Sequence, residues 1–211
     1  MKTDDLIRAM AADTVRPQSP MTLLLLGLVP SLMLSVVIVW LTLGFREDLA
    51  ASLLQPVTAI RIVLGLVLGI AAVRAALVMA RPEGRQIARL WPLAAVGVVA
   101  LGLLAWAYLV TPAEQRLMAT LGKTYVTCLV MIPLLSILPV ASVLYAQRRG
   151  ATTAPALAGF VAGLAGSGLA AAIYAMHCTE DSPLFYVTWY GLAIIGVTLI
   201  STVIGARVLR W

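Results

Sequence analysis

The sequence predicts an all-α membrane protein: a six-helix transmembrane bundle with both termini in the cytoplasm and a short cytoplasmic helix at the N-terminus. Hydrophobic residues make up 62% of the 211-residue chain and charged residues 11%, and the mean hydropathy is +1.00. A soluble domain carries about 45–50% apolar and about 25% charged residues. The apolar residues also form runs of about 20, the length that a helix needs to cross the ~30 Å hydrocarbon core. A bilayer is therefore the expected solvent for most of the chain, and helices are expected to cross it.

Each predicted span has ends that suit a membrane helix. The first run is too long for a signal peptide and lacks a small-residue cleavage site, so we expect it to remain as a span. Prolines stand at or just before four of the starts, where the missing N–H costs least: Pro56, Pro92, Pro155 and Pro183. The chain divides into a cytoplasmic segment, residues 1–20, and a transmembrane domain, residues 21–211. The spans are placed near residues 21–43, 56–80, 92–110, 124–146, 155–175 and 184–206.

Basic residues near the span ends predict the orientation, because Lys and Arg gather on the cytoplasmic side. Arg61 and Arg74 fall inside the second span, one near each end, and are expected to extend outward toward the interface. The bias predicts a bacterial inner-membrane protein with both termini inside. One side holds Lys2, Arg8, Arg16, Arg81, Arg85, Arg89, Arg148, Arg149, Arg207 and Arg210, and the other holds Arg46, Arg116 and Lys123.

The sequence offers no set of residues for catalysis, so we expect a protein that is not an enzyme. No span has an acidic residue in its middle, and the chain has a single histidine. No nucleotide-binding loop, His-Glu-x-x-His motif or Ser-His-Asp set is visible. The net charge of +6 is explained by residues that set orientation, so direct binding to nucleic acid is not expected.

The outer loop 176–183 gathers His177, Cys178, Glu180 and Asp181. The other cysteine, Cys128, lies just inside the fourth span at the same predicted level. Three interpretations remain open. The cysteines can be two small unpaired side chains, or a disulfide or redox-sensitive pair, which the periplasm favours. They can also form a metal site with His177, and with Glu180 or Asp181, since thiolate and imidazole suit zinc. Such a metal ion is the single cofactor that the residues suggest.

The N-terminal tail has the pattern of a short amphipathic helix. Asp4 and Asp5 fall in its first turn, and Leu6, Ile7 and Met10 share one face. One interpretation is a helix lying on lipid or on the bundle. The other is a peptide ligand, whose apolar stripe enters a partner's groove and whose acids meet a basic rim. The acids favour the partner, because an anionic membrane surface would repel them.

Small residues in the second and fifth spans have the small-xxx-small spacing that lets helix backbones approach closely. They include Gly65, Gly69, Gly159 and Gly163. The spacing favours packing inside the bundle, and a homodimer interface is the alternative.

Two short motifs resemble the NrsF family (negative regulator of sigma F). The first is the opening Met-Lys-Thr-Asp-Asp-Leu-Ile-Arg-Ala-Met-Ala-Ala-Asp. The second is the loop 177–183, running into Phe185 and Trp189-Tyr190 after six short-looped spans. The resemblance covers essentially the whole chain. It implies a membrane-embedded anti-sigma factor that holds an extracytoplasmic-function sigma factor at the inner membrane until a stress signal arrives. It also implies sensing by Cys128 and Cys178 and matches the family's Asp-Asp-Leu stretch to Asp4, Asp5 and Leu6.

These observations together predict an anti-sigma factor whose tail binds the sigma factor and whose outward cysteine pair controls release in response to redox or metal stress. Two other classes remain as alternatives. A small transporter or channel would need a polar path through the bundle, and central ionisable residues are missing. A membrane thiol oxidoreductase would usually carry a Cys-x-x-Cys motif, and the chain has none.

Overall fold

The computed structural model describes residues 3–12 and 19–210, and these form ten helices and no strand. Six of the helices are long and apolar enough to cross a membrane. Their ends differ from the predicted spans by at most two residues, which confirms the six predicted helices. They are α2 (Pro20–Thr42), α4 (Pro56–Met79), α6 (Trp91–Val110), α8 (Tyr125–Arg148), α9 (Pro155–Tyr174) and α10 (Pro183–Val208).

The helix starts follow from local chemistry. Ser19 caps α2, because its hydroxyl accepts a hydrogen bond from the backbone N–H of Thr22 at 3.1 Å. Proline occupies the first or second position of α4, α6, α9 and α10, as the sequence predicts.

The remaining helices are short. The tail helix α1 (Thr3–Ala12) is confirmed, with both acids in its first turn. The helices α3 (Leu49–Leu53), α5 (Gly84–Ile87) and α7 (Ala113–Leu121) lie where only loops were expected. They escape prediction because they are too short to show a clear apolar period.

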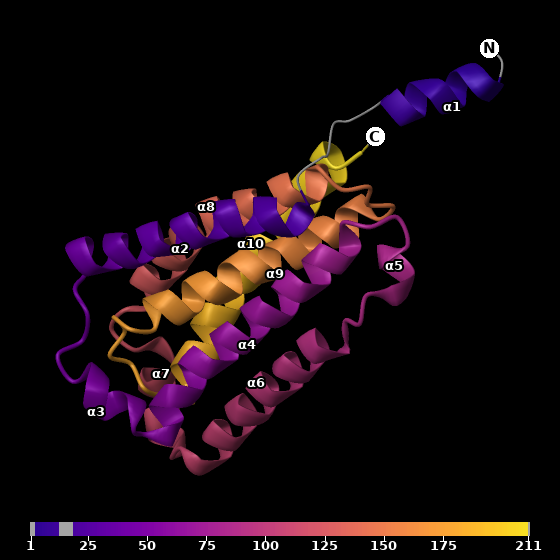
Figure 1. Cartoon of the computed structure of the whole chain (residues 1–211). Helices are drawn as coiled ribbons and strands as arrows, with labels where there is room; N and C mark the ends of the chain where they lie inside the picture. Colours follow the sequence, from indigo (N-terminus) through magenta and orange to yellow (C-terminus); the bar gives the residue numbers. More distant parts are fainter. Residues whose placement is uncertain (1–2, 13–18, 211) are drawn as a thin grey trace.

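The helix α9 lies at the centre of the bundle and packs against α4, α8 and α10 (Figure 1). Its small residues make this possible. A Cβ on Gly163 would lie 2.6 Å from the Cα of Thr198 in α10, and one on Gly65 would lie 2.9 Å from the carbonyl of Gly168. The predicted close packing inside the bundle is confirmed, and its cause is the absence of side chains at these contacts.

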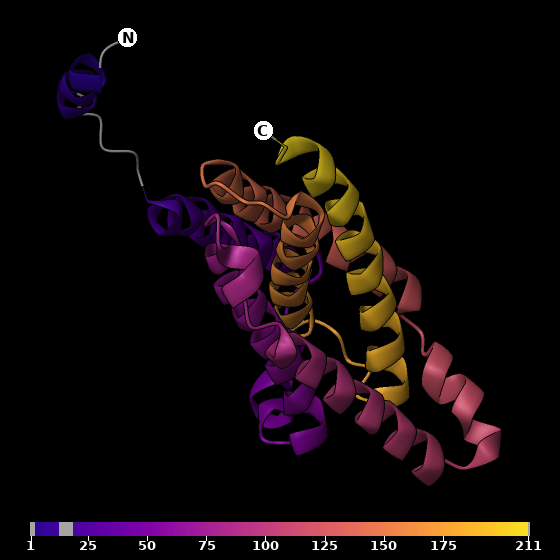
Figure 2. The same ribbon diagram turned by 90° about the vertical axis from the view of Figure 1, so that its right-hand side faces the viewer.

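The loops meet at two ends of the bundle. At the end that carries the C-terminus, the N–H of Ala151 donates to the carbonyl of Ala80 at 2.8 Å. At the other end, the N–H of Arg46 donates to Met176 at 3.2 Å, so the α2–α3 and α9–α10 connections lie side by side. Figure 2 shows the helices running between these ends. The predicted outer loops are therefore neighbours in space.

The outward faces of the long helices are apolar. Leu26, Leu41, Leu109 and Ile200 are each more than 60% exposed. In water this surface would be a strong aggregation hazard, whereas hydrocarbon would solvate it.

Candidate functional site

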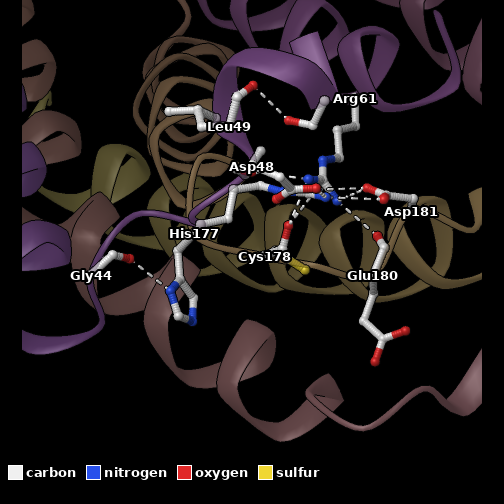
Figure 3. A network of polar contacts seen from close by, with 11 residues as sticks. Gly44, Asp48, Leu49, Arg61, His177, Cys178, Glu180 and Asp181 are labelled. Atoms are coloured by element: carbon white, nitrogen blue, oxygen red, sulfur yellow. Dashed lines mark hydrogen bonds and ion pairs between the residues drawn. The ribbon is translucent and has the colours of Figure 1, made fainter. Parts of the chain in front are cut away.

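The α9–α10 loop is held by a buried arginine from α4. The guanidinium of Arg61 donates to the carbonyls of Glu180 at 2.8 Å, Cys178 at 2.6 Å and Ala175 at 3.2 Å (Figure 3). It also lies 3.3 Å from a carboxylate oxygen of Asp181. One side chain thus gathers the last turn of α9 and the loop around Cys178.

The expectation that Arg61 extends outward is wrong, because its side chain is buried at 2% exposure. The α9–α10 loop offers carbonyl and carboxylate acceptors next to the first turns of α4. The charged guanidinium of Arg61 needs such partners in apolar surroundings. By contrast, Arg74 near the other end of α4 is exposed. The position of an arginine inside an apolar run indicated in the sequence that Arg61 is special. The direction of its side chain could not be predicted, because it depends on the acceptors that the α9–α10 loop offers.

A second arginine, Arg46, reaches the same loop from the α2–α3 connection. Its guanidinium contacts Asp48 at 2.7 Å and Asp181 at 2.9 Å, and it donates to the carbonyl of Cys178 at 3.3 Å. The hydrogen bonds to Asp48 and then Asp181 raise the pKa of Arg46, and the same contact lowers the pKa of Asp48. Asp181 is therefore shared by two arginines, an arrangement that the sequence did not reveal.

The two cysteines meet beneath this loop. Cys128, in the first turn of α8, and Cys178 are both buried free thiols in one apolar cluster with Tyr174, Phe185 and Tyr190. The Cys128 thiol also lies 3.5 Å from the hydroxyl of Tyr174. Cys128 and Cys178 are 50 positions apart in the chain and lie in the same cluster. This agrees with the prediction that both lie at the same level of the membrane.

The environment of Cys178 favours its thiolate. The neighbouring Cys128 thiol does most to lower the pKa of Cys178, to about 6, against the opposing effect of burial, and the Tyr190 hydroxyl also lowers it. The nearby positive charge of Arg61 acts in the same direction. A thiolate beside a thiol is the arrangement from which a disulfide forms or a soft metal is bound.

His177 points to another partner. Its Nδ1 lies 2.8 Å from the carbonyl of Gly44, and its ring packs beside Tyr174 (Figure 3). Within the described ranges, no three His, Cys, Asp or Glu side chains converge as metal ligands do. The metal site of Cys128, His177 and Cys178 stays a prediction.

Contacts from α7 and from the α7–α8 turn complete this end of the bundle. The carboxylate of Glu180 accepts from the backbone N–H of Lys123 at 2.8 Å, and the indole N–H of Trp189 donates to the carbonyl of Thr120 at 2.7 Å. Gly122 ends α7 with φ of +55°, and a Cβ there would meet the ring of Phe185. The loop is therefore held by α4, by the α2–α3 connection and by the α7–α8 turn.

The tail residues lie on α1. The side chains of Asp4 and Asp5 are exposed, and that of Ile7 is 58% exposed. The side chains of Leu6 and Met10 lie outside the described part, so their common face with Ile7 stays a prediction.

The fold and site define an all-helical protein with six helices of membrane length and, at one end of them, a polar network built around a thiol pair. The chain belongs to the NrsF family, the negative regulators of sigma F, whose model matches residues 9–211. The predicted resemblance is confirmed, and the chain is thereby a regulatory protein of the anti-sigma class. The matched range begins after Asp4, Asp5 and Leu6.

Two curated relatives align along their whole length and the whole of this chain. One, 34% identical over 217 residues, is the anti-sigma-F factor NrsF of Caulobacter vibrioides. The other, 31% identical over 230 residues, is described as a "probable anti-sigma-F factor NrsF" of Azospira oryzae. No solved structure matches the chain.

Proposed function

We propose that this protein holds an extracytoplasmic-function sigma factor at the bacterial inner membrane and releases it under stress. The full-length similarity to two anti-sigma-F factors carries the proposal. Six apolar helices of membrane length support the membrane location. The excess of Lys and Arg at one end supports cytoplasmic termini.

The tail is the proposed handle for the sigma factor. Exposed Asp4, Asp5 and Ile7 on one short helix offer two charges and an apolar contact to a partner. Leu6 and Met10 complete the stripe if the helix presents it as its sequence predicts. A partner groove with a basic rim suits this combination.

The thiol pair is the proposed sensor, responding to oxidation or to a soft metal ion. Either event changes the bonding of Cys178, whose carbonyl is held by Arg61. Arg61 belongs to α4, which runs to the opposite end of the bundle. A movement of the loop would therefore displace α4 through its contacts with Arg61. A two-state displacement of α4 is the proposed coupling to the tail.

A binding assay with full-length protein in detergent tests the handle. The triple variant Asp4→Ala, Asp5→Ala, Ile7→Ala is compared with wild type for capture of the bacterium's extracytoplasmic-function sigma factors. We expect at least tenfold weaker capture, because the charges and the apolar contact are both removed. Glu114→Ala is the matched control, since it removes an exposed acid at the opposite end. Equal capture by the triple variant would refute binding through the tail.

A further inference from the structure

A cavity of ≈ 580 Å³ lies among α4, α6, α9 and α10, next to the thiol pair. Its lining is almost wholly apolar and includes Leu64, Leu68, Ala94 and Leu164. Two lining residues, Leu101 and Ile195, are 65% and 56% exposed, so the cavity opens onto the apolar surface. A hydrophobic molecule dissolved in a bilayer could enter it directly.

The cavity has one polar end. Arg61, Tyr186 and Tyr190 line the end toward the α9–α10 loop, and apolar residues, Phe160 among them, line the rest. Along α10 the lining runs from Tyr186 to Ile195, roughly 14 Å at a rise of about 1.5 Å per residue. The space suits an elongated molecule with a polar head and an apolar body.

Two hydrogen-bond donors at this end are unused. The Nε of Arg61 makes no hydrogen bond within the described part of the chain, and the hydroxyl of Tyr190 makes none there to an oxygen or nitrogen atom, with the Cys178 sulfur as its polar neighbour. Arg61 is 2% exposed and Tyr190 is 6% exposed. Buried donors of this kind are rarely left unpaired, so an acceptor on a ligand is the expected partner.

The local charges favour a neutral acceptor. The positive charges of Arg46 and Arg61 are balanced by the carboxylates of Asp48 and Asp181, with contacts between 2.7 and 3.3 Å, and the Cys178 thiolate adds a further negative charge. A fatty-acid carboxylate would add an uncompensated negative charge. A carbonyl oxygen would accept from both free donors without disturbing the balance.

We propose that this cavity binds a membrane quinone, with a ring carbonyl at Arg61 and Tyr190 and the isoprenoid tail along α6 and α10. The quinone is then the oxidant of the sensor: the Cys128 thiol and the Cys178 thiolate lose two electrons and the Cys128 proton and form an S–S bond, while the quinone gains the two electrons, takes up that proton and one from water, and becomes a quinol. This redox step rests on the proposed sensing function, whereas the binding does not.

The neighbouring thiols distinguish a quinone from an ordinary lipid. A phospholipid chain would use the apolar walls but has no chemistry to exchange with a dithiol. Tyr190 lines the cavity and also packs in the same cluster as both cysteines. The tyrosine is therefore the contact between the cavity's polar end and the thiol pair.

Glycine positions allow a matched test of binding. Gly97 and Gly191 line the cavity, whereas Gly102 and Gly196 lie on the same two helices outside it. An added Cβ meets nothing within 4 Å at any of the four. Leucine at Gly97 or Gly191 should fill the cavity without harming the fold, and leucine at Gly102 or Gly196 should not affect it.

The probe is a quinone with a ten-carbon tail, titrated into full-length, dithiol-form protein in detergent without oxygen. We expect saturable binding by wild type, Gly102→Leu and Gly196→Leu, and at least tenfold weaker binding by Gly97→Leu and Gly191→Leu. Tyr190→Phe, which loses only the hydroxyl, should weaken binding severalfold. Equal binding by all variants, or equal competition by a fatty acid or a phospholipid, would overturn the proposal.

The redox step has a separate readout. Alkylation should count two fewer free thiols after quinone is added to wild type, and no loss in Cys128→Ser, which still binds the probe. Persistence of both wild-type thiols at saturating quinone would overturn the redox step. Cysteine-dependent release of the sigma factor without quinone binding would overturn this inference alone. Quinone binding together with unaltered release of the sigma factor under stress in Cys128→Ser would instead overturn the proposed sensing.

Discussion

Arg61 is the residue on which the candidate site depends most. Its charged guanidinium is buried on an apolar helix. The free-energy cost of burying this charge is offset by contacts with three carbonyls and a carboxylate at one end of the bundle. The carbonyl of Cys178 has a second donor in Arg46, whereas those of Ala175 and Glu180 accept a side-chain hydrogen bond from Arg61 alone within the described part of the chain. Charge and loop therefore stabilise each other, and Cys178 is positioned as a result.

Replacing Arg61 should release the loop. Arg61→Gln removes the donor of the Ala175 and Glu180 carbonyls and leaves that of Cys178 with Arg46. An unpaired buried group costs about 1–3 kcal/mol, so we expect a lower melting temperature in detergent. Alkylation of Cys178 should also become faster. Arg74→Gln on the same helix is the control, because that side chain is exposed. Unchanged melting in the Arg61 variant would contradict the role assigned to this contact.

The thiolate of Cys178 should titrate near pH 6. Its pKa in the fold is lowered from 9.0 to about 6, so its ionisation stabilises the fold fully above pH 9, and this contribution is lost as the pH falls through about 6. Thiolate absorbance against pH measures the transition. In Cys128→Ala the midpoint should rise, because the largest cause of the shift is removed. A midpoint at the ordinary thiol value in wild type would disprove this environment.

At the scale of elements, α9 organises the bundle because its small residues admit three neighbouring helices. The contacts of Gly163 with Thr198 and of Gly166 with Val140 are backbone approaches that no larger residue allows. The same glycine spacing could equally have served a homodimer, and the homodimer stays a prediction. Because α9 is buried inside the bundle, its glycines contact other helices of the same chain.

Adding a side chain at this contact should disrupt α9–α10 packing. In Gly163→Val the new atoms meet the Thr198 backbone, which cannot move aside without shifting α10. Overpacking of this kind typically costs about 1–3 kcal/mol or more. Thermal unfolding in detergent measures it, with Gly196→Val on α10 as the control at an open position. Equal stability of both variants would show that the helices are not this close.

At the scale of the molecule, the two ends of the bundle differ in chemistry. One end carries paired loops and most of the basic residues, and the other carries the arginines, acids and thiols of the site. A regulator that senses on one side of a membrane and binds on the other needs such a division. The proposed orientation places the site outside and the tail in the cytoplasm.

Labelling of single cysteines tests that orientation. In a background with Cys128→Ala and Cys178→Ala, Glu114→Cys should react in intact cells with a membrane-impermeant thiol reagent. Glu83→Cys should react only after the inner membrane is permeabilised, because it lies at the opposite end. Both original residues are exposed, so accessibility within the fold does not separate them. The reverse pattern would invert the topology.

The sequence by itself determined the number and limits of the six long helices, since an apolar run of about 20 residues bounded by prolines and charges leaves little freedom in lipid. It also placed Cys128 and Cys178 at one level of the membrane, because the start of the fourth span and the end of the fifth span face the same side. Tertiary structure decided the rest. The inward turn of Arg61, the sharing of Asp181 and the cavity beside Tyr190 depend on contacts between residues more than a hundred positions apart, such as Arg61 and Cys178. Local patterns carry no record of such contacts, because a side chain's direction depends on which acceptors the packed bundle brings within its reach.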